Sequence, residues 1–166
     1  MNKIIIHTDG SSKGNPGNGG WSAIIVYSQQ IIDNSEVKEI GGSEKDTTNN
    51  RMEMRAAIEA LKKTEAGELV EINSDSEYLI NGITLWVKNW QKNNWRTKDK
   101  REVLNRDLWE ALVEETEKRN VTWKKVLGHS GHSFNDRCDE IAQTLAEGKK
   151  VLLYNGSKQG YKLFHS

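Results

Sequence analysis

Apolar residues first gather in two short runs near the N-terminus, "KIIIHTD" and "AIIVY". Their β-branched side chains favour extended structure, so we predict strands over residues 4–9 and 21–27. Gly, Asn and Pro residues between the two runs indicate a chain reversal. A third strand is expected over residues 31–40, where the run is weaker and polar enough to indicate an edge position.

The hydrophobic period then changes from that of a strand to that of a helix. Met54, Ile58 and Leu61 lie at i, i+4 and i+7, which is one apolar stripe of a helix. Asn50, with Glu53 three residues later, resembles a capping arrangement. We therefore expect this helix to begin near Asn50.

The second half of the chain alternates strand and helix patterns. We predict a short strand around residues 69–72 that ends at "NSDSEY", a helical stretch over 76–90 interrupted at Gly82, a helix marked by Leu104, Leu108 and Leu112, a strand over 121–127, and a last helix over 134–145. Three strands followed by αβαβα predict an α/β fold in which helices pack on a mixed sheet.

Length and composition fit one soluble domain with a real core, since the chain has 166 residues. The formal net charge is zero, so a nucleic-acid partner would have to meet a local basic patch. A single cysteine, Cys138, excludes an internal disulfide and fits a reducing compartment. The first apolar run is too short for a signal peptide and no stretch could cross a bilayer, so we expect a cytoplasmic protein with no membrane partner.

Four acids are expected to converge at one edge of this sheet. Asp9 and Asp75 end two predicted strands, and ligands of open α/β sheets gather at such ends. Glu53 is expected in the first turn of its helix, and Asp139 lies next to the apolar stripe of the last helix. Like charges packed together repel, so such a cluster needs a multivalent cation. Oxygen ligands indicate Mg²⁺ or Mn²⁺ rather than zinc.

Spacing alone leaves simpler interpretations of these acids open. The chain has 24 Asp and Glu residues, most of which are expected to be solvated surface charges. Glu53 alone would also complement the dipole of a helix N-terminus, and Asp9 alone would also suit a turn. The sequence motifs around the acids decide between these interpretations.

The motifs "TDGSSKGNPGNGGW", "TTNNRMEMRAAIEAL", "NSDSEYLINGI" and "GHSGHSFNDRCDEIA" each contain one of the four acids. In this order they resemble type 1 ribonuclease H of the cellular, bacterial-like kind, from residue 3 to about 147. The resemblance implies a catalytic domain over 1–147 with a five-stranded mixed sheet, its first three strands antiparallel, and helices on both faces. Residues 148–166 are then a C-terminal extension that we expect to dock on the domain.

The resemblance also implies an activity, which is hydrolysis of the RNA strand of RNA–DNA hybrids by a monomer without an obligate protein partner. It implies two Mg²⁺ ions per site, with Mn²⁺ as a possible substitute, and products with 3′-hydroxyl and 5′-phosphate ends. The implied metal ligands are Asp9, which bridges the two ions, and Glu53, Asp75 and Asp139.

A histidine and a fifth acid lie close to the last of these acids. The resemblance makes His129, in "GHSGHS", a mobile proton carrier, whereas the simpler interpretation is a surface-loop histidine. Asp136 falls outside the "RCDE" motif, so we do not place it among the metal ligands.

Contacts with the hybrid are expected at two places, of which the first is near Asp9. Gly10 has no Cβ and would let a nucleic-acid backbone approach Asp9. The resemblance assigns hybrid contacts to Asn15, Thr48, Asn49 and Asn50, and neutral groups suit recognition of 2′-hydroxyls and A-like shape. Capping of the following helix is the alternative role of these residues.

The second place is the basic segment 88–106, "KNWQKNNWRTKDKREVLNR", which has seven Lys and Arg against two acids, a net charge of +5. Three tryptophans, Trp86, Trp90 and Trp95, interleave with this charge. A solvated helix with its Trp residues in the core is one interpretation. The resemblance instead implies a basic protrusion that binds the DNA strand through Lys88, Asn89, Trp90, Lys92, Arg96 and Lys98.

Two positions depart from the family pattern, and two other classes of protein compete with it. Glu77 stands where relatives often have an uncharged amide, which puts a minor-groove contact in doubt, and Asp46 stands where some have a basic residue. An actin-like or sugar-kinase ATPase would need a second lobe. A non-catalytic hybrid-binding protein would gain nothing from four acids that repel phosphate. Hybrid-reading Asn residues argue against a transposase-like or junction-cutting enzyme.

Overall fold

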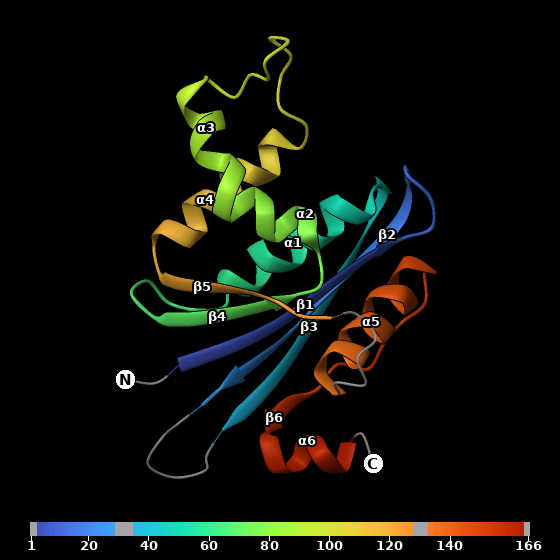
Figure 1. Ribbon diagram of the computed structural model, residues 1–166. Helices are drawn as coiled ribbons and strands as arrows, with labels where there is room; N and C mark the ends of the chain where they lie inside the picture. The colour runs from blue at the N-terminus through green and yellow to red at the C-terminus, as the bar shows by residue number, and fades with distance from the viewer. Residues whose placement is uncertain (1–2, 29–34, 128–132, 165–166) are drawn as a thin grey trace.

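The fold is built on one six-stranded sheet, shown in Figure 1 for the computed structural model, which describes residues 3–28, 35–127 and 133–164. Its order is β5-β4-β1-β2-β3-β6. The strands are β1 (Lys3–Ser12), β2 (Gly17–Tyr27), β3 (Glu36–Thr47), β4 (Leu69–Ser74), β5 (Asn120–Lys125) and β6 (Asn155–Ser157).

The sheet is mixed, as predicted. β1, β2 and β3 form an antiparallel meander, while β4 and β5 run parallel to β1. In the pairing of β1 with β4, His7 lies opposite Asn73. Asp9 and Asp75 each come two residues after this pair. The register therefore brings the two acids to the same level of the neighbouring segments.

Two details of the predicted sheet are wrong. The prediction of five strands missed β6, whose three residues are too few and too polar to give a strand pattern. β6 pairs with residues 36–38 of β3, so β3 is covered at that end and is not an open edge throughout. β5 begins at Asn120 and ends at Lys125, and the exposed Leu127 lies beyond it.

Helices cover both faces of the sheet (Figure 1). They are α1 (Asn49–Leu61), α2 (Glu77–Asn81), the π-helix η1 (Gly82–Trp86), α3 (Val87–Lys92), α4 (Arg106–Glu117), α5 (Ser133–Ala146) and α6 (Lys158–Phe164). Successive strand residues point to opposite faces. Accordingly Ile25 packs with α1 and α4, whereas Ile24 and Val26 pack with α5 and α6.

Three predicted helix boundaries need correction. The N-cap of α1 is Thr48, whose hydroxyl accepts from the Arg51 N–H at 3.2 Å, so Asn50 is not the cap. The helical stretch does not break at Gly82 but continues through the π-helical turn. Leu104 lies outside α4 because Asn105, in the left-handed region with φ 62°, precedes the helix, and Leu104 is 74% exposed.

The residues after α5 lie against the far edge of the sheet. The Tyr161 hydroxyl, on α6, donates to the buried Glu39 carboxylate at 2.8 Å. Arg137, on α5, donates to the same carboxylate at 2.8 and 3.1 Å. A buried ion pair with further hydrogen bonds thus joins β3, α5 and α6.

Among the described residues, no helix has the length and apolar character that a membrane crossing requires.

Candidate active site

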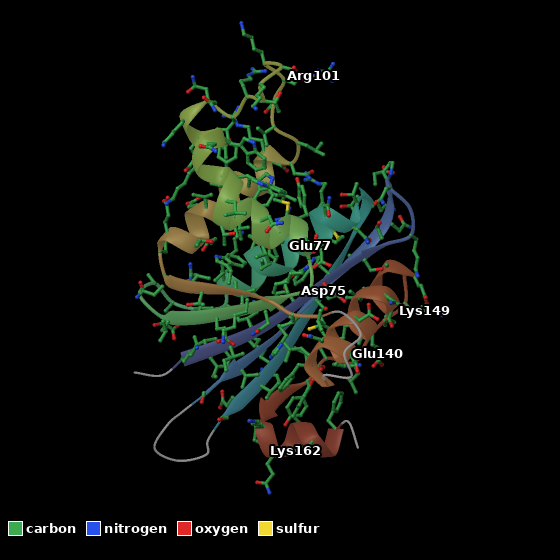
Figure 2. All side chains as sticks on the ribbon, viewed as in Figure 1. Asp75, Glu77, Arg101, Glu140, Lys149 and Lys162 are labelled. Carbon is green, nitrogen blue, oxygen red and sulfur yellow. The ribbon has the colours of Figure 1, made fainter. Side chains whose placement is uncertain are left out.

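Three carboxylates meet where β1, β4 and α1 come together. Asp9 lies on β1, Asp75 directly follows β4, and Glu53 is on α1. One oxygen from each of the three lies within 4.8 Å of the others. Glu53 is buried and Asp75 is the most exposed of the three, so the cluster opens to solvent on the Asp75 side. Asp75 is labelled in Figure 2.

The backbone, rather than long side chains, brings these acids together. A Cβ atom at Gly10 would clash with the backbone nitrogen of Glu53 and the carbonyl carbon of Met52. Gly10 therefore lets α1 pack directly on β1, which is a different role from the close approach of a nucleic acid that we expected. Asp9 does not end its strand, because β1 continues to Ser12, and Glu53 lies in the second turn of α1.

Burial and mutual repulsion both disfavour the ionised form of this cluster. Burial raises the pKa of Asp9 to about 7, the charges of Asp75 and Asp139 add to the rise, and hydrogen bonds with Glu53 and the Gly10 N–H oppose it. Burial, followed by the charge of Asp9, also raises the pKa of Glu53 well above its ordinary value. Binding of a proton by this pair is therefore favoured when no cation is present.

The donor set suits a hard divalent cation. Glu53 Oε2 is buried, and it has no hydrogen-bond partner within the described part of the chain. A buried oxygen of this kind is costly unless something binds it. Carboxylate oxygens are the ligands that Mg²⁺ and Mn²⁺ prefer in proteins. Asp9, Glu53 and Asp75 thus fit the metal-ligating role expected of them.

Asp139 shares a pocket with two of these acids but stands apart from the tight cluster. It lies on α5, and the pocket is lined by Thr8, Asp9, Asp75, Asn135, Asp136 and Asp139. The Gln143 amide donates to both Asp139 carboxylate oxygens, at 3.0 and 2.9 Å. The accessible space is about 10 Å³, which is room for a water or an ion but not for a nucleotide.

Sequence reasoning missed three residues that line this pocket, which are Thr8, Asn135 and Asp136. Asp136 was set aside because it falls outside its motif. Its spacing of three residues from Asp139 on a helix would have placed the two acids on one face. The buried Thr8 hydroxyl also has no partner among the described residues. No sequence signal pointed to Thr8, since its place depends on how α5 packs on β1.

Two of the residues expected to contact the hybrid near Asp9, Asn15 and Asn49, are hydrogen-bonded to each other. The Ser12 N–H donates to the Asn49 side chain at 2.6 Å, and the Asn49 N–H donates to Asn15 Oδ1 at 3.2 Å. Thr48 caps α1, and Asn50 is exposed beside it. These contacts fix the turn after β1 against the start of α1. Asn15, Asn49 and Asn50 remain accessible on the same surface.

Glu77 lies in the first turn of α2, where its exposed carboxylate is paired with Lys125 of β5. The hydrogen bond to Lys125 holds the pKa of Glu77 below its ordinary value. The negative charge that departs from the family pattern is therefore partly neutralised within the protein.

The basic segment forms a protrusion that rises from the body on α3 (Figure 1). One cavity of about 530 Å³ there is lined by Trp86, Asn89, Trp90, Asn93, Arg96, Thr97 and Lys98. It brings together four of the residues expected to bind DNA. Lys88 and Lys92 are exposed on α3 outside this cavity. Trp90 and Trp95 also pack against the main core. Trp90 thus both packs on the core and lines the cavity expected to bind DNA.

His129 lies outside the described residues, as do the glycines of its loop. Phe134, which follows this loop on α5, stacks on the His7 ring of β1 with ring centroids 4.8 Å apart. The start of α5 is therefore fixed against β1.

Known proteins resemble this chain in sequence and in fold. The ribonuclease H of Francisella tularensis subsp. novicida (strain U112) is 52% identical over 141 residues, which are 85% of this chain and 89% of that protein. The ribonuclease H of Francisella philomiragia subsp. philomiragia is 51% identical over the same shares.

Two solved structures are similar to this chain in fold. LC9-RNase H1, described as a type 1 RNase H with the type 2 active-site motif, superposes with a TM-score of 0.83 at 27% identity, over 97% of this chain and 81% of that one. LC11-RNase H1, solved in complex with an RNA/DNA hybrid, has a TM-score of 0.60 at 21% identity, over 87% and 97% of the two chains, and shows the fold.

The resemblance inferred from the four motifs is confirmed by the family model for RNase H, which matches residues 1–147. The match includes all four acids of the site, and it does not include the extension after residue 147. The chain belongs to the RNase H family.

Proposed function

We propose that this chain hydrolyses the RNA strand of RNA–DNA hybrids at the pocket formed by Asp9, Glu53, Asp75 and Asp139, leaving 3′-hydroxyl and 5′-phosphate ends. The observation that carries the proposal is the convergence of Asp9, Glu53 and Asp75 within 4.8 Å in a chain of the RNase H family. Since the pocket itself is too small for a nucleotide, the scissile phosphate lies over its mouth, on the open Asp75 side.

Two Mg²⁺ ions, for which Mn²⁺ could substitute, would activate the attacking water and stabilise the leaving 3′-oxygen. Asp9 would ligate both ions; its membership of the three-acid cluster and the pocket that it shares with Asp139 support this role. Glu53 and Asp75 complete the ligands on one side. Gln143 orients the carboxylate of Asp139 on the other side.

Recognition of the hybrid is assigned to two surfaces. Asn15, Asn49 and Asn50 offer neutral donors and acceptors near Asp9, which suits 2′-hydroxyls. The cavity on the protrusion combines Arg96 and Lys98 with tryptophan faces, which suits a DNA backbone.

The central test is to incubate the protein with labelled RNA–DNA hybrid, double-stranded RNA and double-stranded DNA, with and without Mg²⁺. Asp75→Asn keeps the size of the side chain but removes a ligand charge, so cleavage should fall by at least ~10²-fold, the usual cost of losing one electrostatic stabiliser. Binding of hybrid in Ca²⁺ should survive. Glu65→Gln is the matched control, because Glu65 is an exposed acid beyond the far end of α1. Hybrid bound but never cut by the unmodified protein would favour the non-catalytic class.

A second prediction concerns stability in chelator. Because the folded-state pKa of Asp9 is raised to about 7, the folded chain binds more protons than the unfolded chain between about pH 4 and pH 7. Stability should therefore fall as pH rises through this window and level off above it. Asp9→Asn should raise Tm at pH 8 by at least ~2–4 °C, which is about 1 kcal/mol for a chain of this size, with a smaller effect at pH 5 and little change at the lower end of the window, near pH 4. Thermal unfolding in EDTA measures this. Parallel pH profiles of Tm for the two proteins would show that burial and neighbouring charges do not disfavour the Asp9 carboxylate.

The proposal includes His129 as a proton carrier. His129→Ala should slow cleavage by ~10²-fold, the lower range for general acid–base catalysis, and should alter the dependence of kcat on pH between 6 and 9. Its dependence on Mg²⁺ concentration should remain that of the unmodified protein. A rate and pH profile unchanged by the substitution would return His129 to the role of a surface histidine.

The protrusion is tested by salt. Replacing Lys92, Arg96 and Lys98 by Ala should weaken hybrid binding and flatten the slope of log K against log salt by somewhat under ~0.9 for each lost phosphate contact. The measurement is a salt titration of binding in Ca²⁺, with Lys62→Ala after α1 as the matched control for loss of an exposed charge. Equal slopes in the triple variant and the unmodified protein would mean that the charge run is a solvated face.

A further inference from the structure

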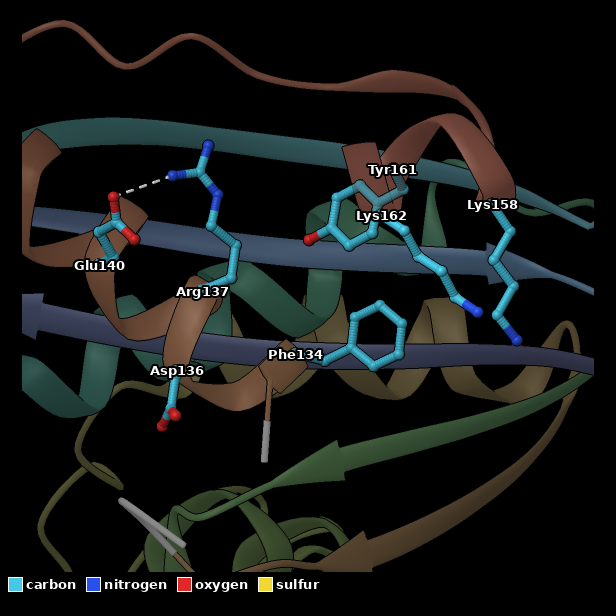
Figure 3. Close-up of a pocket in the computed structure, with 7 residues that line it drawn as sticks. All are labelled: Phe134, Asp136, Arg137, Glu140, Lys158, Tyr161 and Lys162. Carbon is cyan, nitrogen blue, oxygen red and sulfur yellow. Dashed lines mark hydrogen bonds and ion pairs between the residues drawn. The ribbon is translucent and has the colours of Figure 1, made fainter. Parts of the chain in front are cut away.

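A second cavity adjoins the acid pocket on the side away from the protrusion. It lies between α5 and α6 and has a volume of about 520 Å³, the size of a typical small-ligand site (Figure 3). It is lined by Phe134, Asp136, Arg137, Glu140, Lys158, Tyr161 and Lys162. Asp136 lines both this cavity and the acid pocket, so the two are neighbours along α5. α6 lies beyond residue 147, outside the part of the chain that the family model matches.

The lining holds two acids and three bases, and Glu140 is paired with Arg137. The two lysines are the bases that remain available to an anion. Lys158 and Lys162 are four residues apart on α6, so their side chains share one face of the helix. Figure 3 shows both chains extending the same way beside the Phe134 ring, while Asp136 points away from them. Neither lysine has an ion-pair partner among the described residues, in contrast to Arg137.

The lysines stand on a fixed platform. The Tyr161 hydroxyl, between them in sequence, donates to the buried carboxylate of Glu39. The Lys158 N–H donates to the Ser35 carbonyl at 2.9 Å, and β6 pairs with β3 immediately before α6. Side chains presented from an anchored helix lose less freedom on binding than those of a loose tail would lose.

The aromatic residues of the cavity are already engaged in stacking. Phe134 stacks on His7 and also on Tyr161, with ring centroids 4.8 and 5.8 Å apart. We therefore assign no base stacking to Phe134. What the cavity offers a nucleic acid is the pair of ammonium groups, which suits backbone phosphate and not base recognition.

We propose that Lys158 and Lys162 bind a phosphate of the RNA strand, at a nucleotide beyond the one whose phosphate lies over the acids. This inference rests on the proposed function and adds a contact to it. In Figure 2, Asp75 lies between Arg101 of the protrusion and Lys162 of α6, and Asp136 lines both the acid pocket and the lysine cavity. The protrusion and α6 therefore hold the substrate on opposite sides of the cut, and both contacts are independent of sequence.

The test compares the double variant Lys158→Ala/Lys162→Ala with the unmodified protein on a hybrid that extends well past the cut on both sides. Kd, measured in Ca²⁺, and KM, measured in Mg²⁺, should each rise roughly 3- to 10-fold, as expected for two exposed ionic contacts. The slope of log K against log salt should flatten by up to ~0.9 for each contact. Lys158→Arg/Lys162→Arg should restore most of the affinity.

Lys150→Ala is the matched control, because Lys150 is an exposed lysine of the same extension that does not line the cavity. Unchanged Kd and slope in the double variant, or an equal loss in Lys150→Ala, would overturn the assignment. A second arm titrates inorganic phosphate and a 5′-mononucleotide into the free protein. Saturable binding that the double variant loses would assign the cavity to free nucleotides instead.

The same experiments separate this inference from the proposed function. If the unmodified protein binds hybrid but does not cut it, the proposed function fails while the salt comparison still tests the lysines. If the unmodified protein cuts hybrid and the double variant binds it with the same Kd and slope, the contact on α6 fails alone.

Discussion

The site depends on two places where a helix lies in direct contact with a strand backbone. At Gly10 a side chain would clash with α1, and at Gly20 a side chain would clash with the Ala142 carbonyl of α5. These helices lie on opposite faces of the sheet. Because both approach the two central strands so closely, acids from two strands and two helices reach one edge. Backbone packing sets the distances between these acids, and rotation of their side chains cannot increase these distances much.

Packing therefore imposes a repulsion between these carboxylates that only a bound proton or a cation offsets. Glu53 is held in the interior with one oxygen lacking a partner in the described chain, and the pKa values of Asp9 and Glu53 both rise in response. The apolar core on both faces of the central strands keeps the fold intact around these charges. A cation is thus favoured as a partner of the folded state, since it removes the repulsion without moving any element.

The sequence predicts the parts of the structure that depend on local period and strand order. Asp9 and Asp75 could be placed together because both follow apolar runs of parallel neighbouring strands. The role of Gly10 could not be predicted, because a close approach of helix and strand leaves no local pattern. The prediction of Asn50 as the cap of α1 failed for a related reason. Thr and Asn both suit an N-cap, and tertiary packing makes Thr48 the cap. Glu39 looked like an ordinary polar residue of a strand, because Arg137 and Tyr161, which pair with it, come about a hundred residues later.

The Glu39 network also explains why the extension can take part in the site at all. A tail attached only by its chain would sample many positions, and its charges would add little to binding. Here one carboxylate receives hydrogen bonds from Arg137 of α5 and from Tyr161 of α6. Arg137 lies two residues before Asp139, so the Glu39 carboxylate that holds α6 through Tyr161 also holds, through Arg137, the turn of α5 that carries the acid. The acid pocket and the lysine cavity are consequently held in one geometry, and a substrate strand that fits one is presented to the other without further ordering of the protein.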